Sequence, residues 1–343
     1  MKILVTGGTG SVGRTAVKRL VENGHQVQVI GRRAGIEIDG AQYRQCDITD
    51  FDLLRKQVKG MEGIVHLAAI PSPGRHPASE VFHINCSGTF NVYQAAAQEG
   101  IGKISCASSI NALGFNYGRK PFPISYFPID EEHPTFTTDP YSFSKQITEQ
   151  IADYFWRREN ISSVNLRFPG VYEVNMERLE RWRKHAARFK KTMTEFLAQP
   201  KTEQRERIQR AIARFDATRP DRAGYLPREE AIKRWRTPGN DPDLGLLMGG
   251  FGRSNFWASV DARDSAQALE KGLLADYEGS HPLFINSSHN AAGIKSETLL
   301  QVFFPEVQER KRPLPGTESL VSIEKARKLI GFEPEYSVLD LLE

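Results

Sequence analysis

A glycine-rich turn near the start of the chain restricts the fold more than any other feature of the sequence. The apolar run Lys2–Val5 leads directly into GGTGSVG at residues 7–13, and a segment of helical period follows from Val12 to Glu22. In this setting the first glycine permits a tight turn, the third lets the backbone approach a pyrophosphate at the helix N-terminus, and the fourth permits close helix–sheet packing. The turn predicts dinucleotide contacts at Gly7, Gly10, Ser11, Val12 and Gly13.

Up to about residue 170 the sequence alternates short β-branched runs with segments of helical period, which is typical of a parallel sheet with crossover helices. Six strands are predicted at Lys2–Val5, Gln26–Ile30, Ala41–Gln45, Gly63–Leu67, Lys103–Cys106 and Ser163–Leu166. Helices are predicted at Val12–Glu22, Phe51–Val58, Glu80–Glu99 and Pro140–Arg158. The pattern indicates an α/β fold with a doubly wound parallel (Rossmann) sheet, whose ligand crevice lies beyond the carboxyl ends of the strands.

Positive charge is concentrated in one later segment. The whole chain has 46 Lys+Arg against 42 Asp+Glu, so its net charge of +4 gives no reason to expect a nucleic-acid partner. Residues 174–238, however, hold 18 of the basic and 9 of the acidic residues. Apolar positions at helical spacing predict helices over Met176–Leu197 and Lys201–Ala217, broken at Pro200 and Pro220. We favour a charged helical insertion whose aromatic stripe packs on the body or on a second subunit of a homodimer, with an anion-binding surface as the alternative.

The α/β rhythm returns from Phe251. A helix is predicted near Arg263–Leu274, a strand at Leu283–Asn286, and helices near Ser296–Phe303 and Ile323–Ile330. We therefore predict a Rossmann domain from residues 1–172 and about 246–275, a helical insertion at 173–245, and a smaller substrate-binding region at 276–343.

The end of the second predicted strand bears on the choice of cofactor. About twenty residues after the glycine turn, where an NAD enzyme usually places a carboxylate against the ribose 2′-hydroxyl, the chain reads Ile30-Gly31-Arg32-Arg33. A carboxylate would repel a 2′-phosphate, whereas glycine and two arginines leave room and charge for one. NADP is therefore favoured over NAD. The alternative is that Arg32 and Arg33 are ordinary loop cations.

A tyrosine and a lysine stand one helical turn apart, at Tyr141 and Lys145, on the helix that follows the fifth strand. Ser108 and Ser109 end the fifth strand, where a hydroxyl could hydrogen-bond a substrate oxygen near the same tyrosine. Removing a proton from an alcohol near neutral pH requires a phenol whose pKa is lowered, and a cation a few ångströms away does that. The grouping therefore indicates proton transfer at the carboxyl edge of the sheet.

With these motifs the chain resembles the extended short-chain dehydrogenase/reductase family, the NAD-dependent epimerase/dehydratase group. The resemblance covers residues 1–172 and resumes from Phe256 to the end, so the inserted segment is expected to lie outside it. It rests on the glycine turn, on the YxxxK spacing at Tyr141, and on Asp47-Ile48, His66–Ala69, Asn85–Val92, Ala107–Ser109, Leu166–Tyr172, Val260–Asp264 and Gly331–Pro334.

The resemblance implies roles for individual residues. Tyr141 would be the general acid/base, Lys145 would hold the ribose hydroxyls and favour the phenolate, and Ser109 would bind the reacting oxygen. Ser109 is preferred to Ser108 because it stands five residues before Gly114, the family spacing. Asp47 and Ile48 would flank the adenine, Ala68 and Asn85 would line the cofactor channel, and Pro169 would lie against the nicotinamide. The full set of implied cofactor contacts outside the glycine turn is Arg32, Arg33, Asp47, Ile48, Leu67, Ala68, Ala69, Asn85, Ser108, Tyr141, Lys145 and Pro169.

Three functions are consistent with the sequence. The favoured one is an NAD(P)-dependent oxidoreductase that interconverts a secondary alcohol and a carbonyl on a small polyhydroxylated substrate. The alternatives are a sugar-nucleotide epimerase or dehydratase and a non-catalytic NAD(P)-sensing regulator. The complete set of Ser109, Tyr141 and Lys145 argues against the regulator, because a binding module has no need of proton transfer.

Two positions argue against a nucleotide handle on the substrate. Sugar-nucleotide members of the resembled family commonly present an asparagine where this chain has Gly170, and an arginine where it has Trp257. A buried diphosphate without charge-assisted donors is strongly penalised. Arg253 or a cation of the insertion could substitute for them. The favoured substrates are therefore a free sugar, a sugar acid of the kind handled by the similar uronate dehydrogenases, or another hydroxy-carbonyl compound.

Metal binding and membrane insertion are not expected. The histidines at positions 83, 133, 185 and 289 show no ligand spacing, and the three cysteines form no CxxC pair, which favours a reducing compartment. The first strand leaves no room for a signal peptide, and no apolar stretch approaches the ~20 residues that span a bilayer. We expect a soluble, cytoplasmic protein without a membrane partner.

Overall fold

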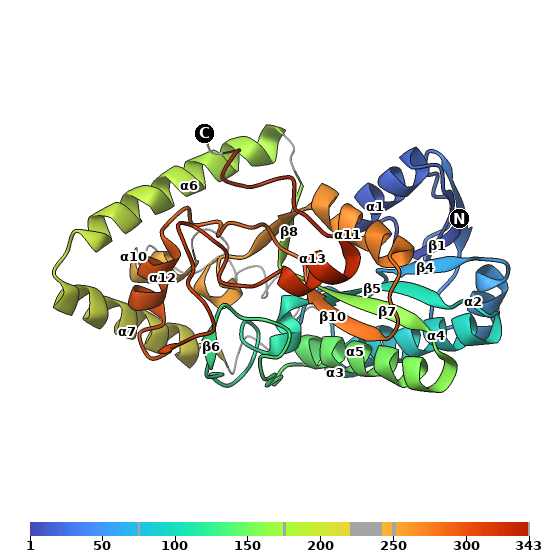
Figure 1. Cartoon of the computed structure of the whole chain (residues 1–343), viewed down its shortest axis with the longest axis horizontal. Helices are drawn as coiled ribbons and strands as arrows, with labels where there is room; N and C mark the ends of the chain where they lie inside the picture. Colours follow the sequence, from blue (N-terminus) through green and yellow to red (C-terminus); the bar gives the residue numbers. More distant parts are fainter. Residues whose placement is uncertain (75, 174–175, 220–241, 249–251, 342–343) are drawn as a thin grey trace.

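The central sheet has seven parallel strands in the order β10-β7-β5-β4-β1-β2-β3 (Figure 1). The computed structural model describes the chain except for residues 75, 174–175, 220–241, 249–251 and 342–343. The strands are β1 (Lys2–Thr6), β2 (Gln26–Gly31), β3 (Ala41–Gln45), β4 (Gly63–His66), β5 (Lys103–Ser109), β7 (Ser162–Phe168) and β10 (Ser280–Phe284). The α/β, doubly wound parallel class predicted from the sequence is confirmed.

The seventh strand, β10, differs from the prediction. The sequence places a strand at Leu283–Asn286 and counts six in the sheet, whereas β10 begins at Ser280 and pairs with β7. Its first three residues, Ser280, His281 and Pro282, are only partly buried, as is usual in an edge strand. They form no apolar run, so the sequence pattern does not mark them as part of a strand. The sheet therefore extends past residue 275 into the segment that the sequence analysis assigned to the substrate-binding region.

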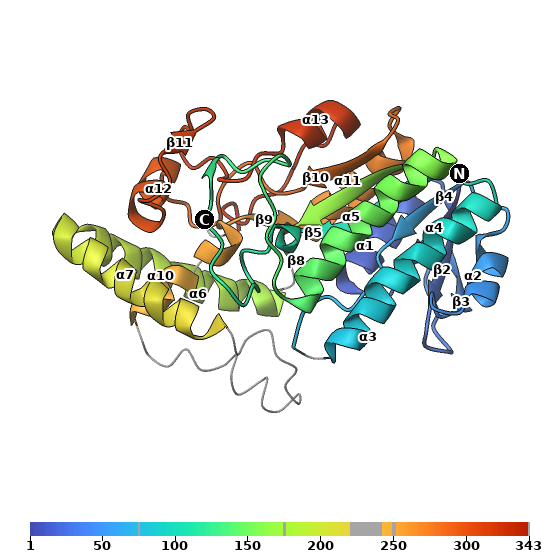
Figure 2. The same ribbon diagram turned by 90° about the horizontal axis from the view of Figure 1, so that it is seen from below.

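Side-chain alternation along the strands creates two buried layers. On β1, Ile3 and Val5 belong to one hydrophobic cluster and Leu4 to another. Helices α1 (Ser11–Glu22), α11 (Ala262–Leu274) and α13 (Glu324–Ile330) cover the first face. Helices α2 (Phe51–Val58), α4 (Gly88–Gln98) and α5 (Pro140–Glu159) cover the second (Figures 1 and 2). Both faces of the central strands are buried, which explains the continuous apolar residues at 3–5 of β1 and 64–65 of β4.

The helix predicted at Glu80–Glu99 is divided into three parts. α3 (Ala78–Phe82) passes into a π-helical turn, η1 (His83–Ser87), and then into α4. Asn85 lies in this turn and is buried, with its side chain bonded to neighbouring elements rather than exposed on a helix surface. π-Helical turns of this kind often occur at functional sites, and residue spacing alone does not reveal them.

Several short elements at the carboxyl edge were not predicted, because two or three residues carry no periodic signal. β6 (Tyr126–Phe127) pairs with β11 (Glu309–Arg310), and β8 (Gly170–Tyr172) pairs with β9 (Ser259–Asp261). The 3₁₀ turns η2 (Ile110–Leu113) and η3 (Arg253–Asn255) and the short helix α10 (Pro242–Met248) were not predicted either. The helix α12 (Ser296–Phe303), in contrast, was predicted with the same bounds.

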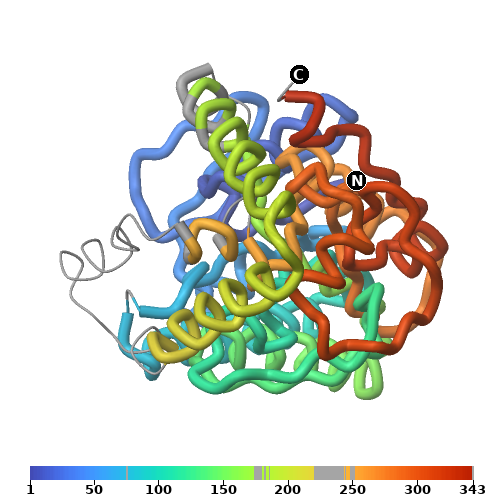
Figure 3. Tube along the Cα trace, turned by 90° about the vertical axis from the view of Figure 1, so that its left-hand side faces the viewer, coloured from blue at the N-terminus to red at the C-terminus, as the bar shows by residue number. Residues whose placement is uncertain are grey.

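The insertion contains two long helices with the predicted bounds, α6 (Met176–Leu197) and α7 (Lys201–Ala217), separated at Pro200. They meet at the edge of the molecule farthest from the sheet (Figure 1) and lie beside the C-terminal segment (Figure 3). Phe196 and Met193 of α6 and Ile208 of α7 are buried in one cluster with residues of η2, α10 and α12. The part of the predicted aromatic stripe from Phe189 onward therefore packs on the body of the same chain. The predicted break at Pro220 falls outside the described residues.

Candidate active site

The glycine turn has the close backbone approach that the sequence predicts. Gly7 adopts φ +71°, and a Cβ there would lie 2.7 Å from the Ala68 amide nitrogen. A Cβ on Gly13 would lie 2.4 Å from the Gly7 carbonyl oxygen, so this glycine lets α1 pack against the turn. Gly10 is the N-cap residue of α1 and provides no side-chain cap. The N-terminus of α1, at Ser11 and Val12, therefore has no side-chain cap, which is a feature of helix ends that bind anions.

The loop after β2 holds both arginines at the surface. Arg32 and Arg33 are exposed, while their carbonyl oxygens accept hydrogen bonds from Gln45 and Tyr43 of β3. A Cβ on Gly31 would come within 2.8 Å of the Tyr43 hydroxyl oxygen, so a larger residue there would displace the tyrosine hydroxyl. The role of β3 in fixing this loop was not predicted.

Asp47 and Ile48 follow β3 and shape the next turn. The Asp47 carboxylate accepts hydrogen bonds from the backbone and hydroxyl of Thr49. Ile48 is buried under Gly88, where a Cβ would lie 2.5 Å from its Cδ1 atom. Asn91 donates to the Ile48 carbonyl at 3.0 Å. These contacts place Ile48 against the first turn of α4, at the carboxyl end of β3.

A chain of buried hydrogen bonds orders the end of β4. The Thr6 hydroxyl accepts from the amides of Leu67 and Ala68, so its proton points to His66 Nδ1, 2.7 Å away. His66 Nε2 then donates to Thr89 Oγ1 at 3.0 Å. Burial, and secondarily the Lys145 charge, lowers the pKa of His66 to about 3. His66 is therefore a neutral connector with a fixed tautomer.

Asn85 links the loop after β4 to helix α5. Its side chain accepts from the Ile70 amide at 2.7 Å and donates to the Ile70 carbonyl and to Ser144 Oγ. Leu67, Ala68 and Ala69 precede this loop and are partly buried. The side-chain amide of Asn85, which was predicted to line a cofactor channel, is thus hydrogen-bonded to the loop after β4 and to α5, the helix that carries Tyr141 and Lys145.

Asp139 and Pro140 fix the start of helix α5 at the carboxyl edge of the sheet. The Asp139 side chain accepts from the amides of Tyr141 and Ser142, and Pro140 occupies the first helical position. Tyr141 and Lys145 are each only 6% exposed. Lys145 Nζ donates to the Ala107 carbonyl of β5 at 2.8 Å and lies 6.0 Å from the centre of the Tyr141 ring.

The hydroxyl of Ser109, rather than that of Ser108, lies beside the phenol of Tyr141. Its hydrogen bond to the phenol lowers the pKa of Tyr141. Its oxygen accepts from the Asn111 amide at 3.2 Å and from Asn111 Nδ2 at 3.1 Å. Two donors occupy the acceptor positions of a serine hydroxyl, so its own proton is left to donate. The Phe168 carbonyl, just before Pro169, is a distant acceptor at 3.4 Å. Asn111 therefore makes Ser109 a hydrogen-bond donor toward the site.

The electrostatics of the phenol differ from the expectation. Burial raises the pKa of Tyr141 above its ordinary value, with smaller contributions from Tyr117 and Asp139, and the hydrogen bond from Ser109 only partly offsets this. Lys145 is also buried, which lowers the pKa of its ammonium group. The lysine was expected to lower the pKa of the tyrosine. In the structure the lowering contribution comes from Ser109, and burial outweighs it.

The other predicted serine, Ser108, is used elsewhere. Its hydroxyl donates to Glu149 at 2.7 Å, and Glu149 forms a two-point ion pair with Arg167 of β7 at 2.9 and 2.8 Å. Both charged side chains are buried. The sequence analysis missed this pair, although Glu149 continues the four-residue spacing of Tyr141 and Lys145 along one helix face.

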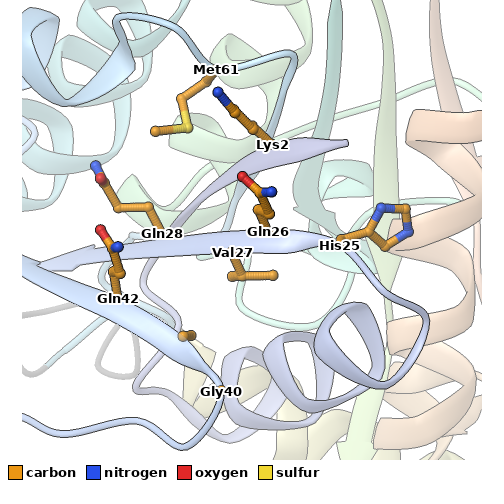
Figure 4. Close-up of a pocket in the computed structure, with 9 residues that line it drawn as sticks. Lys2, His25, Gln26, Val27, Gln28, Gly40, Gln42 and Met61 are labelled. Atoms are coloured by element: carbon orange, nitrogen blue, oxygen red, sulfur yellow. The ribbon is translucent and has the colours of Figure 1, made fainter.

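A pocket of about 660 Å³ lies at the opposite edge of the sheet (Figure 4). Lys2, Gln26 and Gln42 line it, close to the starts of β1, β2 and β3. Ligands of doubly wound sheets bind beyond the carboxyl ends of the strands, where Tyr141 lies. This pocket is therefore separate from the candidate site.

The described residues contain no group of three or more His, Cys, Asp or Glu side chains that could hold a metal ion. Cys46, Cys86 and Cys106 are buried free thiols. His133 accepts from the Ser125 amide and contacts the Pro134 carbonyl, which explains its burial. Within the same described ranges, no helix is long and apolar enough to cross a membrane.

A solved structure has the same fold as this chain. It is a short-chain dehydrogenase/reductase superfamily protein from Agrobacterium tumefaciens, solved with bound NAD, and it superimposes with a TM-score of 0.64 and 20% identity, over 100% of this chain and 95% of that one. The model of the NAD dependent epimerase/dehydratase family matches residues 3–208, and the chain belongs to that family. The matched range continues past residue 172 into α6 and α7, so the prediction that the whole insertion lies outside the family pattern is wrong.

Two curated relatives align with about half the length of this chain. Uronate dehydrogenase of Pseudomonas syringae pv. tomato is 26% identical over 168 residues, 48% of this chain and 58% of the relative. UDP-glucose 4-epimerase of Streptomyces lividans is 33% identical over 184 residues, 51% of this chain and 53% of the relative. The chain thus spans little more than half the length of the curated relatives it matches.

The His66 connector predicts a pH dependence of stability. Its pKa is about 3 in the folded protein and about 6.5 in an unfolded chain, so the unfolded state binds one more proton between these values. The free energy of unfolding should fall as the pH falls below about 6.5, by up to about 1.4 kcal/mol per pH unit from this group. His66→Gln should lack this contribution. Urea unfolding of both proteins between about pH 7 and pH 5 should show their stabilities converging toward acid pH; a constant difference would contradict the assignment.

Proposed function

We propose that the chain is an NADP-dependent oxidoreductase that interconverts a secondary alcohol and a carbonyl on a small polyhydroxylated substrate. The observation that carries this proposal is the grouping of Ser109, Tyr141 and Lys145, all buried, at the carboxyl edge of the sheet. A buried phenol with a hydroxyl donor beside it and an ammonium behind it is suited to moving a proton to or from a substrate oxygen. Family membership and the similarity to a uronate dehydrogenase support this class of reaction.

The residues of the site fit a dinucleotide. Gly10 at the N-cap of α1 leaves that helix end without a side-chain cap, as a bound pyrophosphate requires. We assign Asp47 and Ile48, at the carboxyl end of β3, to the adenine, and Lys145 to the ribose hydroxyls. The cofactor, when bound, supplies the nicotinamide that exchanges hydride with the substrate carbon.

The proton chemistry is assigned to three side chains. In the oxidation direction Tyr141 Oη takes the hydroxyl proton of the substrate, and in reduction it returns that proton. Ser109 donates a hydrogen bond to the same substrate oxygen, a role that Asn111 enforces by occupying its acceptor positions. The Lys145 ammonium stabilises the phenolate form of Tyr141. Because burial raises the pKa of Tyr141, the phenol stays protonated until the site is loaded.

A substrate without a nucleotide is favoured by the side chains around the crevice. Gly170 of β8 offers no side chain, and Trp257 is fully buried against Phe303, with ring centres 5.0 Å apart. Arg253, the substitute cation named by the sequence analysis, is buried and donates to the Phe303 carbonyl at 2.8 Å. These three positions therefore supply no ready partner for a diphosphate. A free sugar or a sugar acid is the proposed substrate class.

The second candidate function is a sugar-nucleotide epimerase, favoured by the similarity to UDP-glucose 4-epimerase over half of the chain. Such an enzyme re-reduces its own intermediate, so it gives no net reduction of the cofactor. Binding of a UDP-sugar and the absence of net redox turnover would together distinguish it from the proposed function.

The cofactor preference rests on Arg32 and Arg33. The wild type should bind NADPH more tightly than NADH, and Arg32→Asp should reverse the order because its carboxylate repels a 2′-phosphate and suits a ribose hydroxyl. We expect a change of at least about tenfold in the ratio of dissociation constants, equivalent to ~1.4 kcal/mol. Nicotinamide fluorescence titration measures both constants, and Arg188→Asp, an exposed site on α6, is the matched control. If the wild type binds NADH at least about tenfold more tightly than NADPH, the assignment of Arg32 and Arg33 to a 2′-phosphate is wrong.

The catalytic assignment predicts the behaviour of Tyr141→Phe. With NADP⁺ and a panel of free sugars and sugar acids, the wild type should show a net increase in absorbance at 340 nm as the cofactor is reduced. Tyr141→Phe should keep cofactor affinity but lose about 100-fold or more in turnover, the usual loss with a general acid/base. Tyr154→Phe, on the exposed face of the same helix, controls for the loss of a hydroxyl.

Two results would oppose the assignment. Near-normal turnover by Tyr141→Phe would remove the tyrosine from the mechanism. Micromolar binding of UDP, UDP-glucose or dTDP by the cofactor-loaded enzyme in calorimetry, without net reduction of the cofactor, would favour the epimerase.

A further inference from the structure

The turn that ends α7 reaches the loop that follows Ser109. Arg219, directly after α7, is only 2% exposed. Its Nη1 atom donates to the Phe115 carbonyl at 2.9 Å and to the Gly118 carbonyl at 3.1 Å. Its Nε atom donates to Asp216. One buried guanidinium therefore binds two carbonyls of a loop that is about a hundred residues away in sequence.

The bound loop leads to the candidate catalytic tyrosine. It carries Tyr117, whose ring packs edge-on against Tyr141, with centres 5.9 Å apart and planes at 79°. The loop starts at Gly114, which has φ +95° and lies so close to Phe136 that a Cβ would be 2.1 Å from its carbonyl oxygen. This end of the loop is fixed by backbone contact. The other end, at Gly118, is held by Arg219.

The surroundings of Arg219 show that its contacts are specific. Its guanidinium lies 5.7 Å from the centre of the Phe115 ring and 5.1 Å from that of Phe215. Arg253 approaches the same Phe115 ring to 5.5 Å. Two buried cations share a small volume, so each needs its own acceptors, and the loop carbonyls are acceptors for Arg219. A lysine has no planar fork and could not bind both carbonyls and Asp216 in the same way.

We propose that Arg219 is a positioning residue of the substrate site: by holding residues 115–118 it fixes Tyr117 against Tyr141, so that the end of α7 supports one side of that site. The inference rests on the proposed function of Tyr141. It assigns the insertion a role in substrate specificity, beyond filling the hydrophobic cluster that it shares with the C-terminal region.

The test compares Arg219→Gln and Arg219→Lys with Arg210→Gln, which removes an exposed arginine from the same helix. Hydrogen–deuterium exchange over residues 110–120 measures whether the loop is held, and it needs no substrate. Exchange should be about tenfold faster in both Arg219 variants and unchanged in the control. The Michaelis constant for the substrate should rise about tenfold in Arg219→Gln and less in Arg219→Lys, while the cofactor dissociation constant stays within about twofold.

Tyr117→Leu provides a second variant that leaves the insertion untouched. It should raise the Michaelis constant similarly, and combining it with Arg219→Lys should add little, because both changes act on one contact. Unchanged exchange, an unchanged Michaelis constant, or fully additive effects of the two substitutions would overturn the proposal. Normal turnover by Tyr141→Phe would instead contradict the proposed function, while the exchange measurement would still decide whether Arg219 holds the loop.

Discussion

The placement of helix α5 on the sheet is the constraint on which the site depends. Glu149 pairs with Arg167 of β7 and accepts from Ser108 of β5, which connects the helix to two neighbouring strands. Removing one member of a buried pair leaves an uncompensated charge and costs several kcal/mol, so the pair opposes any shift of the helix. One turn earlier, Lys145 binds the Ala107 carbonyl, and Ser144 is bonded to Asn85. Tyr141 lies four residues before Lys145 on the same face of α5, so these contacts also fix the position of its phenol.

The second layer of the site comes from parts of the chain that lie far apart in sequence. The loop after Ser109, the insertion and the C-terminal helix α12 share one hydrophobic cluster. Arg219 connects this cluster to the loop beside Tyr141. The sheet thus positions Ser109, Tyr141 and Lys145, whereas the cluster and Arg219 support the loop beside them. A difference in substrate from other family members is expected to arise in this second layer.

The fold could be predicted largely from the sequence because its signals are local: the glycine turn, the apolar runs and the helical periods. β10 and the π-helical turn were misplaced because an edge strand and an extra helical residue leave no periodic trace. Ser109 could be chosen over Ser108 by its distance from Gly114, and the structure places its hydroxyl beside Tyr141. The Glu149–Arg167 pair, Asn111 and Arg219 could not be found in this way, because tertiary packing creates their partners. The expected lowering of the tyrosine pKa failed for the same reason, since burial is a property of the fold.

The central claim is that Tyr141 becomes the proton acceptor once the site is loaded. Its most direct test is ultraviolet difference absorbance near 295 nm, which detects tyrosinate, recorded against pH for the wild type and Tyr141→Phe with and without NADP⁺. Without cofactor the two proteins should titrate alike up to about pH 9, because burial raises the pKa of Tyr141. With NADP⁺, the wild type should show one additional tyrosinate forming between about pH 6 and pH 9 that Tyr141→Phe lacks. Identical titrations of the two cofactor-loaded proteins over this range would contradict the account.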